Sequence, residues 1–395
     1  MMNERLRKIA RPMLVRSADE KHRTATDLEL LFDLVLVIAI ALAAVGLHHS
    51  IAEAHYIDGV VKFSLAFFAL WWPWMHFTWF ASAFDNDDAS YRIAIMVMMF
   101  GALLIAGGLP SFFESFDIRL MTIGYVVLRI PSIYLWYRAG QHNPDYVKTA
   151  NRYVWGQIIL QCFWVTAAFT ITFGSPLFFA LFGLGILAEL LVPYFASKAK
   201  NPPFNKHHIM ERFGLLNIIV MGEVLLSAAL AIQAMSKSGH WTADLIFIAI
   251  AATIVPFALW WLYFNNDENL HSNEVNDVYI WAYTHFFIFT SAAAVGSGFA
   301  ALVDASGDHP HGDADAARWT ISLAIAIYMV AVWLVRDRHV LHQTLSSKLL
   351  GFAVLIALTP LLPVFQLPAL VLLLIVSLTL RLNNPQYKLA MENHV

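Results

Sequence analysis

The chain has 395 residues, of which 59% are hydrophobic and only 13% are charged, and its mean hydropathy is +0.61. Because about a quarter of the residues of a soluble protein are charged, this composition excludes a soluble globular protein. It predicts an all-α, polytopic membrane protein without a sizeable soluble domain. The formal net charge of −3 gives no sign of a nucleic-acid partner, so the main expected partner is the lipid bilayer.

Twelve apolar segments follow one another along the chain, and each is expected to form one membrane-spanning helix. The first six segments are 27–47, 57–80, 92–109, 120–137, 153–173 and 177–195. The second six segments are 210–234, 243–264, 278–302, 318–335, 347–362 and 367–381. We therefore expect two six-helix sets, 25–197 and 210–382, joined by a cytoplasmic linker at 198–209.

The positively charged residues between the segments predict the orientation of the chain. The N-terminal segment 1–24 is basic, and when it is placed in the cytoplasm most other lysines and arginines between segments fall on the same side. Only Arg119, Lys237 and Arg318 fall on the outer side. We therefore expect both termini, including the tail 383–395, to be cytoplasmic.

A short motif occurs twice and indicates an internal repeat. Phe68–Trp72 reads Phe-Ala-Leu-Trp-Trp and recurs unchanged as Phe257–Trp261. A five-residue match that includes two tryptophans is unlikely by chance, and it joins the second segment of each set. Since each set has an even number of segments, we expect parallel repeats related by an axis along the membrane normal.

Three carboxylates lie within apolar sequence. Glu29 and Asp33 are four residues apart, so they share one helix face. When the two halves of the sequence are aligned, Glu223 occupies the position that corresponds to Asp33. A charged side chain in the bilayer costs about 3 kcal/mol, so we expect these acids to bind an ion or a proton. The alternative is that a neighbouring basic residue merely neutralises each acid.

The motifs around these acids resemble the bacterial low temperature requirement A (LtrA) family of integral membrane proteins. They are Glu29–Val35, His208–Phe213 and Met221–Glu223, and the resemblance extends from about Thr26 to the last segment. It implies a multi-span fold in the bacterial cytoplasmic (inner) membrane, whereas the family name describes a growth phenotype and identifies no substrate.

Further polar residues are expected to complete a binding site. Arg129 in the fourth segment lies between the acids in depth if each residue adds about 1.5 Å, so we expect it to be the counter-charge of Asp33 or Glu223. A purely structural ion pair is the alternative. Three more residues are candidates for ion, proton or substrate binding: His76, Asn217 and His285.

A second set of polar residues lies near the cytoplasmic border and is expected to form a gate. Its members are Arg23, Glu189, His208, Glu211 and Arg212. Glu189 is expected either to pair with Arg381 or to reach the interface by extending its side chain along the helix.

Three classes of function are compatible with this pattern. The first is a proton- or cation-coupled secondary transporter for a small solute or ion, with the buried carboxylates at the interface of the two repeats. The second is a cation channel, because Phe32-Asp33 is similar to the Phe-Ser-Asp motif of organellar potassium channels, although the serine is missing and Glu223 replaces the second aspartate. An intramembrane enzyme is the least supported, since no nucleophile motif is present. We expect no cofactor and no metal site, and a homo-oligomer is compatible with this sequence.

Overall fold

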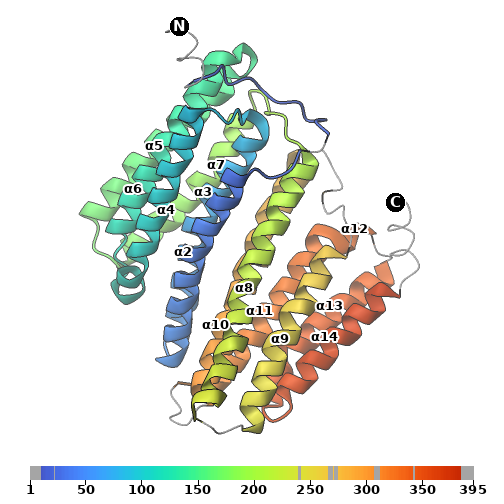
Figure 1. Cartoon of the computed structure of the whole chain (residues 1–395). Helices are drawn as coiled ribbons and strands as arrows, with labels where there is room; N and C mark the ends of the chain where they lie inside the picture. Colours follow the sequence, from blue (N-terminus) through green and yellow to red (C-terminus); the bar gives the residue numbers. More distant parts are fainter. Residues whose placement is uncertain are drawn as a thin grey trace. The chain divides into compact units, whose positions relative to one another are not determined.

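The computed structural model describes residues 10–21, 23–238, 242–265, 270, 275–306, 312–340 and 343–383, and these residues form helices and connecting segments without any strand. The helices of 15 residues or more in this part are α2 (Asp27–Ala52), α3 (Tyr56–Phe84), α4 (Ala89–Ser115), α5 (Arg119–His142), α6 (Val147–Thr170), α7 (Pro176–Ser197), α8 (Lys206–Ser238), α9 (Ala243–Phe264), α10 (Val275–Ala305), α11 (Ala314–Val332), α13 (Gln343–Ala357) and α14 (Gln366–Leu382) (Figure 1). The short elements are η1 (Pro144–Tyr146), η2 (Trp333–Asp337), α12 (Arg338–Val340) and η3 (Thr359–Leu361).

Each of the twelve expected segments coincides with one of these long helices, which confirms the all-α class. Eight helices of the described part are long and apolar enough to cross a membrane. They are α2, α4, α5, α7, α8, α9, α10 and α11. The helices α3 and α6 carry more polar and aromatic residues, and α13 and α14 are short apolar helices. The number of twelve crossings therefore stays a prediction, as do the repeats and the cytoplasmic termini.

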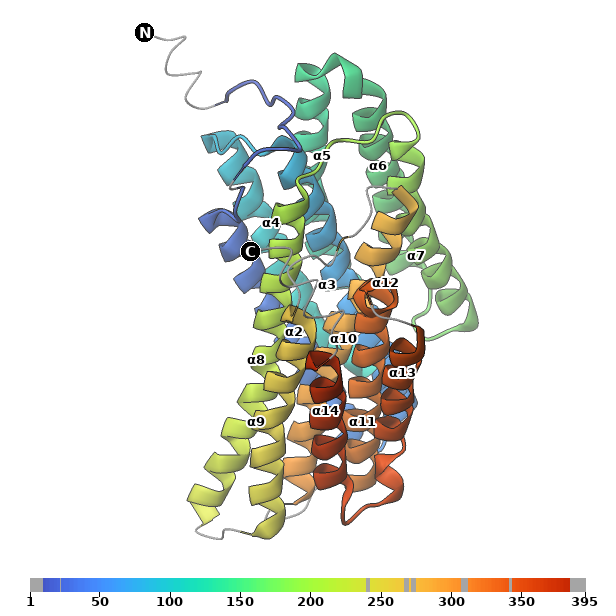
Figure 2. The ribbon, with the colours of Figure 1, turned by 90° about the vertical axis from the view of Figure 1, so that its right-hand side faces the viewer.

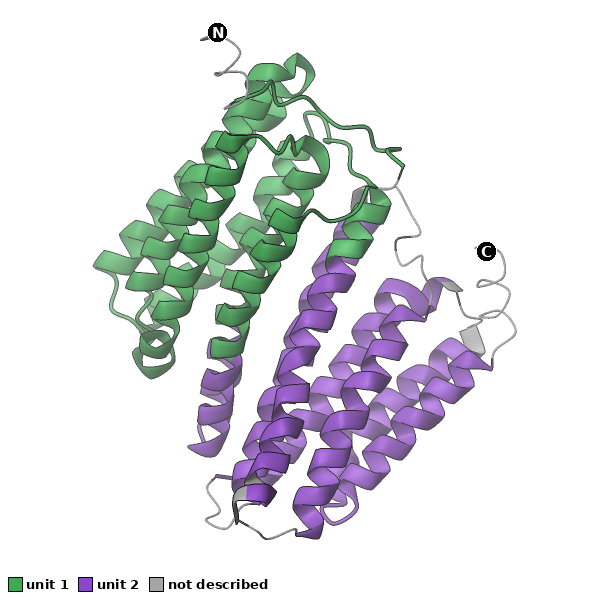
Figure 3. Ribbon diagram, in the orientation of Figure 1, with its two compact units in different colours: residues 1–43, 66–212 green, residues 44–65, 213–395 purple. Residues whose placement is uncertain are grey.

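The chain divides into two compact units (Figure 3). Unit 1 contains residues 1–43 and 66–212, and unit 2 contains residues 44–65 and 213–395. The helices α2, α3 and α8 each contribute residues to both units. Most of the predicted tail 383–395 and residues 1–9 and 22 of the predicted N-terminal segment lie outside the described residues.

Unit 1 is built around a series of helices in which α4 packs against α5, α5 against α6 and α6 against α7 (Figure 1). The contact between α4 and α5 is close because glycines face each other. A Cβ atom added to Gly124 would lie 2.7 Å from the carbonyl oxygen of Gly101 and 2.7 Å from the backbone nitrogen of Ile105. Membrane helices commonly use small residues in this way, since they gain stability from close packing rather than from the exclusion of water.

We expect Gly124→Ala to destabilise unit 1 by about 1 to 3 kcal/mol, because the new methyl group meets backbone atoms that cannot move aside independently. The thermal unfolding midpoint of the purified protein in detergent measures this effect. Gly183→Ala in α7 is the matched control, since no atom lies within 4 Å of the added Cβ there. Equal midpoints for the two variants would contradict the close α4–α5 contact.

The segment before α2 is fixed to the ends of α4 and α5 through Asp88. Asp88 caps the N-terminus of α4 and accepts a hydrogen bond of 2.8 Å from the backbone N–H of Tyr91. It also accepts one of 2.7 Å from the backbone N–H of Arg11 and forms an ion pair with Arg138. Burial raises the pKa of the Asp88 carboxyl, but the hydrogen bonds from Arg138, Tyr91 and Arg11 outweigh this effect and hold the pKa below its usual value.

This lowered pKa predicts a pH dependence of stability. An acid whose pKa is lower in the folded state stabilises the protein above its unfolded pKa of about 3.9, and the stabilisation is lost as the pH falls through the folded value. We therefore expect the difference in unfolding midpoint between the wild type and Asp88→Asn to be largest near pH 6 and to shrink toward pH 3. Asp145→Asn, which alters an exposed pair with Lys200, is the control and should have little effect at any pH. A constant difference across this range would contradict the prediction.

In unit 2, α10 packs against α9 and α11, α11 against α13, and α14 against both α9 and α13 (Figure 2). The interior contains polar side chains that bond to one another. Asn217 donates a hydrogen bond of 3.0 Å to the hydroxyl of Tyr328, and Arg336 and Arg381 both pair with Asp337. These contacts join side chains of different helices of the unit, so part of its polar interior is a structural network.

Candidate functional site

The N-terminus of α2 positions two buried carboxylates. Thr26 and Glu29 form a capping box, in which the Thr26 hydroxyl accepts from the Glu29 backbone N–H at 3.3 Å and Glu29 Oε2 accepts from the Thr26 backbone N–H at 2.8 Å. Asp33 lies one turn further along the same face. The exposed fractions of the Glu29 and Asp33 side chains are 1% and 0%, so both are removed from solvent.

The start of α8 supplies the opposing groups. The Asn205 side chain accepts a hydrogen bond of 3.0 Å from the His208 backbone N–H and so caps this helix. His208 and Arg212 follow on one face, four residues apart, and both are fully buried. Two pairs of residues with the same helical spacing therefore meet.

The contacts between the two pairs are short. Arg212 Nη1 lies 2.9 Å from Glu29 Oε1, and Arg212 Nη2 lies 2.5 Å from Asp33 Oδ1. His208 Nε2 lies 3.1 Å from Glu29 Oε1. The guanidinium of Arg212 therefore bridges both carboxylates, while the imidazole of His208 contacts Glu29. We call Glu29, Asp33, His208 and Arg212 the acid cluster.

Trp74 of α3 completes the environment of Asp33. Its indole N–H donates a hydrogen bond of 2.6 Å to Asp33 Oδ1, the oxygen that also faces Arg212. Asp33 Oδ2 is buried and has no hydrogen-bond partner among the described residues. The two oxygens of this carboxylate therefore differ, and only Oδ2 is available to bind a proton or a cation.

A second layer of charges lies outside the acid cluster. Arg23 Nη2 lies 3.3 Å from Asp85 Oδ2, and the Glu211 carboxylate accepts a hydrogen bond of 3.2 Å from the Ala25 backbone N–H. Burial raises the pKa of the Asp85 carboxyl, and the negative charge of Glu29 raises it further. Asp85 therefore interacts electrostatically with Glu29 of the acid cluster.

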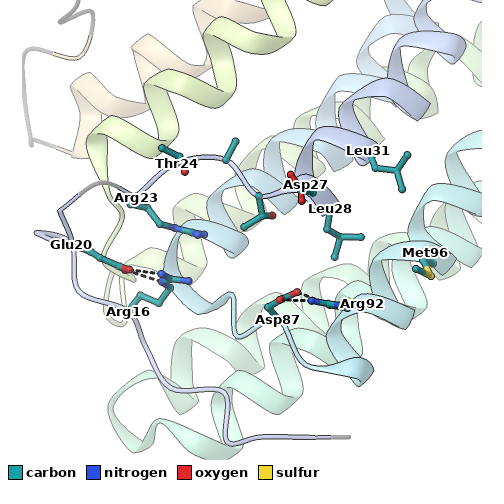
Figure 4. Close-up of a pocket in the computed structure, with 12 residues that line it drawn as sticks. Arg16, Glu20, Arg23, Thr24, Asp27, Leu28, Leu31, Asp87, Arg92 and Met96 are labelled. Atoms are coloured by element: carbon teal, nitrogen blue, oxygen red, sulfur yellow. Dashed lines mark hydrogen bonds and ion pairs between the residues drawn. The ribbon is translucent and has the colours of Figure 1, made fainter. Parts of the chain in front are cut away.

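An open cavity of about 630 Å³ lies beside the start of α2 (Figure 4). It is lined by Arg16, Glu20, Arg23, Thr24, Ala25, Thr26, Asp27, Leu28, Leu31, Asp87, Arg92 and Met96. The ion pairs Arg16–Glu20 and Asp87–Arg92 hold its rim, as the dashed lines in Figure 4 show. Thr26 lines this cavity and also bonds to Glu29, so one residue separates the open cavity from the acid cluster.

Another buried ion pair of unit 1 corrects one expected contact. Arg129 Nη2 of α5 lies 2.6 Å from Glu189 Oε2 of α7, and the indole N–H of Trp72 donates to the same oxygen at 2.9 Å. Arg129 was expected to be the counter-charge of Asp33 or Glu223, but the structure pairs it with Glu189. The physical reason is that the depths of two residues in a membrane do not determine which helices are neighbours.

The gate pair expected between Glu189 and Arg381 also differs from the structure. Glu189 is paired with Arg129, and Arg381 is paired with Asp337. Glu189 is only 3% exposed, so its side chain does not reach the interface either.

The remaining predicted site residues have different surroundings. His285 is a core histidine whose Nε2 lies 2.9 Å from the Tyr263 hydroxyl and whose Nδ1 lies 2.8 Å from the Trp281 carbonyl oxygen. Glu223 is half-buried, and no hydrogen bond or ion pair joins its carboxylate to the described residues of its unit. Its backbone lies close to α10, because a Cβ atom at Gly296 would lie 3.0 Å from the Glu223 carbonyl carbon.

Of the predicted site residues, unit 1 brings together Glu29, Asp33, His208 and Arg212, with Arg23 and Glu211 in the surrounding layer. From the sequence these residues were predicted to form two separate groups, and Thr26, Trp74 and Asp85 were not among the candidates. The capping-box pattern at Thr26–Glu29 was a detectable signal. Trp74 and Asp85 carry no comparable local signal, because their partners are distant in the sequence.

Comparison with known proteins agrees with the resemblance noted from the motifs. A protein of Rhizobium meliloti (strain 1021) named "Uncharacterized protein RA0937" is 25% identical to this chain over 293 residues. The match covers 69% of this chain and 68% of that protein. No solved structure matches the chain. The family model described as "Bacterial low temperature requirement A protein (LtrA)" matches residues 24–382, and the chain therefore belongs to the LtrA family of membrane proteins.

Proposed function

We propose that the protein is a proton- or cation-coupled secondary transporter of the bacterial cytoplasmic membrane, and that the acid cluster holds the coupling ion. The observation that carries the proposal is the composition of this cluster. Two carboxylates share one guanidinium and one imidazole at full burial, so the cluster has one negative charge in excess when His208 is neutral.

A buried net charge is costly, and one proton or one monovalent cation would balance it. Asp33 Oδ2 is the atom suited to hold that ion, since it is buried and has no hydrogen-bond partner among the described residues. Glu29 has a different role, because its oxygens already bond to Thr26 and face Arg212 and His208. Asp33 would therefore bind the ion, while Glu29 would hold Arg212 and His208 in place.

The open cavity supports a path for the ion. It reaches Thr26, whose backbone N–H and hydroxyl both donate to Glu29 Oε2. An ion in the cavity would therefore need to pass only the first turn of α2 to reach the acid cluster. Loss of the Thr26 contacts would open this path, which is the property required of a gate in alternating access.

The wider arrangement in the membrane is part of the same proposal. We propose twelve crossings in two parallel six-helix repeats with cytoplasmic termini, supported by the repeated Phe-Ala-Leu-Trp-Trp motif and the distribution of positive charge. Glu223, which aligns with Asp33, would be the second ion-binding acid. Its carboxylate is half-buried and has no hydrogen bond or ion pair with the described residues of its unit, which supports this role.

Proteoliposomes that contain a pH-sensitive dye test the proposal. Proton movement is recorded under imposed proton, sodium and potassium gradients, with sugars, amino acids and organic acids added one at a time. We expect Asp33→Asn to reduce solute-dependent ion movement at least tenfold, because the neutral amide cannot take up a proton. Asp145→Asn makes the same chemical change at an exposed position that does not line the cavity, and it should leave the movement intact.

Two results would contradict the proposal. Ion movement that Asp33→Asn leaves unchanged would remove the acid cluster from the mechanism. Rapid movement of potassium without any added solute would instead support the channel.

A further inference from the structure

A second group of polar side chains with buried atoms lies in unit 1, on α3, α5 and α6. We call His76, Arg129, Gln157 and Gln161 the glutamine cluster. His76, Arg129 and Gln157 are 8%, 1% and 1% exposed. Five of their side-chain atoms are buried without a hydrogen-bond partner among the described residues: His76 Nε2, Arg129 Nη1, Gln157 Nε2, Gln157 Oε1 and Gln161 Nε2.

The spacing along α6 places the two glutamines between known contacts. Tyr153, Gln157 and Gln161 follow at intervals of four residues, so they share one face of the helix. At one end of this face, the ring of Tyr153 lies 6.1 Å from the ring of His76. At the other end, the indole N–H of Trp164 donates to Glu189 Oε1 at 3.3 Å.

The opposite wall is formed by α3. Its Trp72 bonds to Glu189, and its His76 lies one turn further along the same face, with the two rings 4.6 Å apart. The two glutamines of α6 therefore lie between the level of Glu189 and the level of His76. The side chains that carry the five unpartnered atoms therefore belong to the same part of unit 1.

Leaving a buried polar group without a hydrogen bond costs free energy, and a bilayer offers no replacement partner. Five such atoms belong to the glutamine cluster, three of them on the two glutamines, and buried unpartnered groups of this kind require an explanation. A ligand that supplies the missing hydrogen bonds is one such explanation.

The charges and polar groups define the chemistry of the ligand. Arg129 and Glu189 neutralise each other, so a charged ligand would leave an unbalanced charge in the membrane. The unpartnered atoms include both donors and an acceptor, and a hydroxyl group can serve as either. Aromatic rings of Trp72, Tyr153 and Trp136 border the region and can pack against C–H groups.

We propose that the glutamine cluster binds a small, uncharged polyhydroxylated solute. This inference deepens the proposed function, because such a solute would be the substrate whose movement is coupled to the ion at Asp33. Gln157 would both donate and accept hydrogen bonds, while Gln161 Nε2 and Arg129 Nη1 would donate hydrogen bonds to hydroxyl oxygens of the solute.

Equilibrium dialysis with radiolabelled glycerol, erythritol and myo-inositol tests the proposal on the purified protein in lipid nanodiscs. We expect saturable binding of at least one polyol, without binding of lactate or choline at the same concentrations. Gln157→Leu should weaken this binding at least tenfold, since it removes two hydrogen bonds at similar volume. Gln366→Leu is the control, because it changes a buried glutamine in unit 2 that bonds to Ser322.

Absence of saturable binding by all three polyols would overturn the proposal, as would binding that Gln157→Leu leaves intact or a preference for lactate or choline. This assay measures binding without any ion gradient, so its outcome is independent of coupling. Polyol binding together with unchanged ion movement in Asp33→Asn would contradict the coupled transporter and leave the binding site in place.

Discussion

Replacing Arg212 with methionine is expected to destabilise the protein by about 3 to 5 kcal/mol, which is one of the two largest effects we predict. The guanidinium is fully buried and contacts both Glu29 and Asp33, so its removal leaves two buried carboxylates without the positive charge that they share. The unfolding midpoint of the purified protein in detergent, compared with that of the wild type, measures the loss.

The triple variant Arg212→Met, Glu29→Gln, Asp33→Asn separates charge from packing. It removes all three charges while the glutamine keeps the capping box, so most of the lost stability should return although ion movement should stay absent. Arg119→Met is the control for loss of an exposed arginine and should cost less than about 1 kcal/mol, since Arg119 pairs with Asp117 at the surface. A triple variant as unstable as Arg212→Met would mean that packing of the arginine, and not its charge, stabilises this region.

The helices could be predicted from the sequence because a bilayer restricts the chain strongly. Every backbone polar group must be paired in lipid, so a long apolar segment becomes a helix whatever its neighbours are. For this reason 243–264 was predicted with the bounds of α9. The ends of α2 and α8 were predicted less well. The helix α2 continues beyond its apolar segment to Ala52, and α8 begins at Lys206 and ends at Ser238, where polar residues still form helix.

The four residues of the acid cluster could be named from the sequence as candidates, but their contacts could not. Glu29, Asp33 and Arg212 could be identified because charge in apolar sequence demands an explanation. Their partnership depends on the packing of α8 against α2, which apolar periodicity does not encode. The same limit explains why the partner of Arg129 was not predicted. Arg129 belongs to α5, and its partner Glu189 belongs to α7, with α6 between them in the sequence.

Replacing Arg129 with methionine is the second change with a large expected effect, again about 3 to 5 kcal/mol. Glu189 is 3% exposed, and without Arg129 its charge would retain, among the described residues, the indole N–H groups of Trp72 and Trp164. Glu189→Gln should also destabilise, because it leaves the buried guanidinium without a counter-charge. The unfolding midpoints of the two single variants and the double variant complete the measurement.

The double-mutant cycle decides whether the two side chains act as one unit. If they do, Arg129→Met together with Glu189→Gln should cost at least about 2 kcal/mol less than the sum of the single changes, because no buried charge remains unpaired. A cost equal to that sum would mean that the ion pair contributes no coupling and that each side chain stabilises its own helix. Since Arg129 also belongs to the glutamine cluster, polyol binding should stay weak in the double variant even where its stability returns. Restored stability without restored binding would thus distinguish a ligand-binding arginine from a structural one.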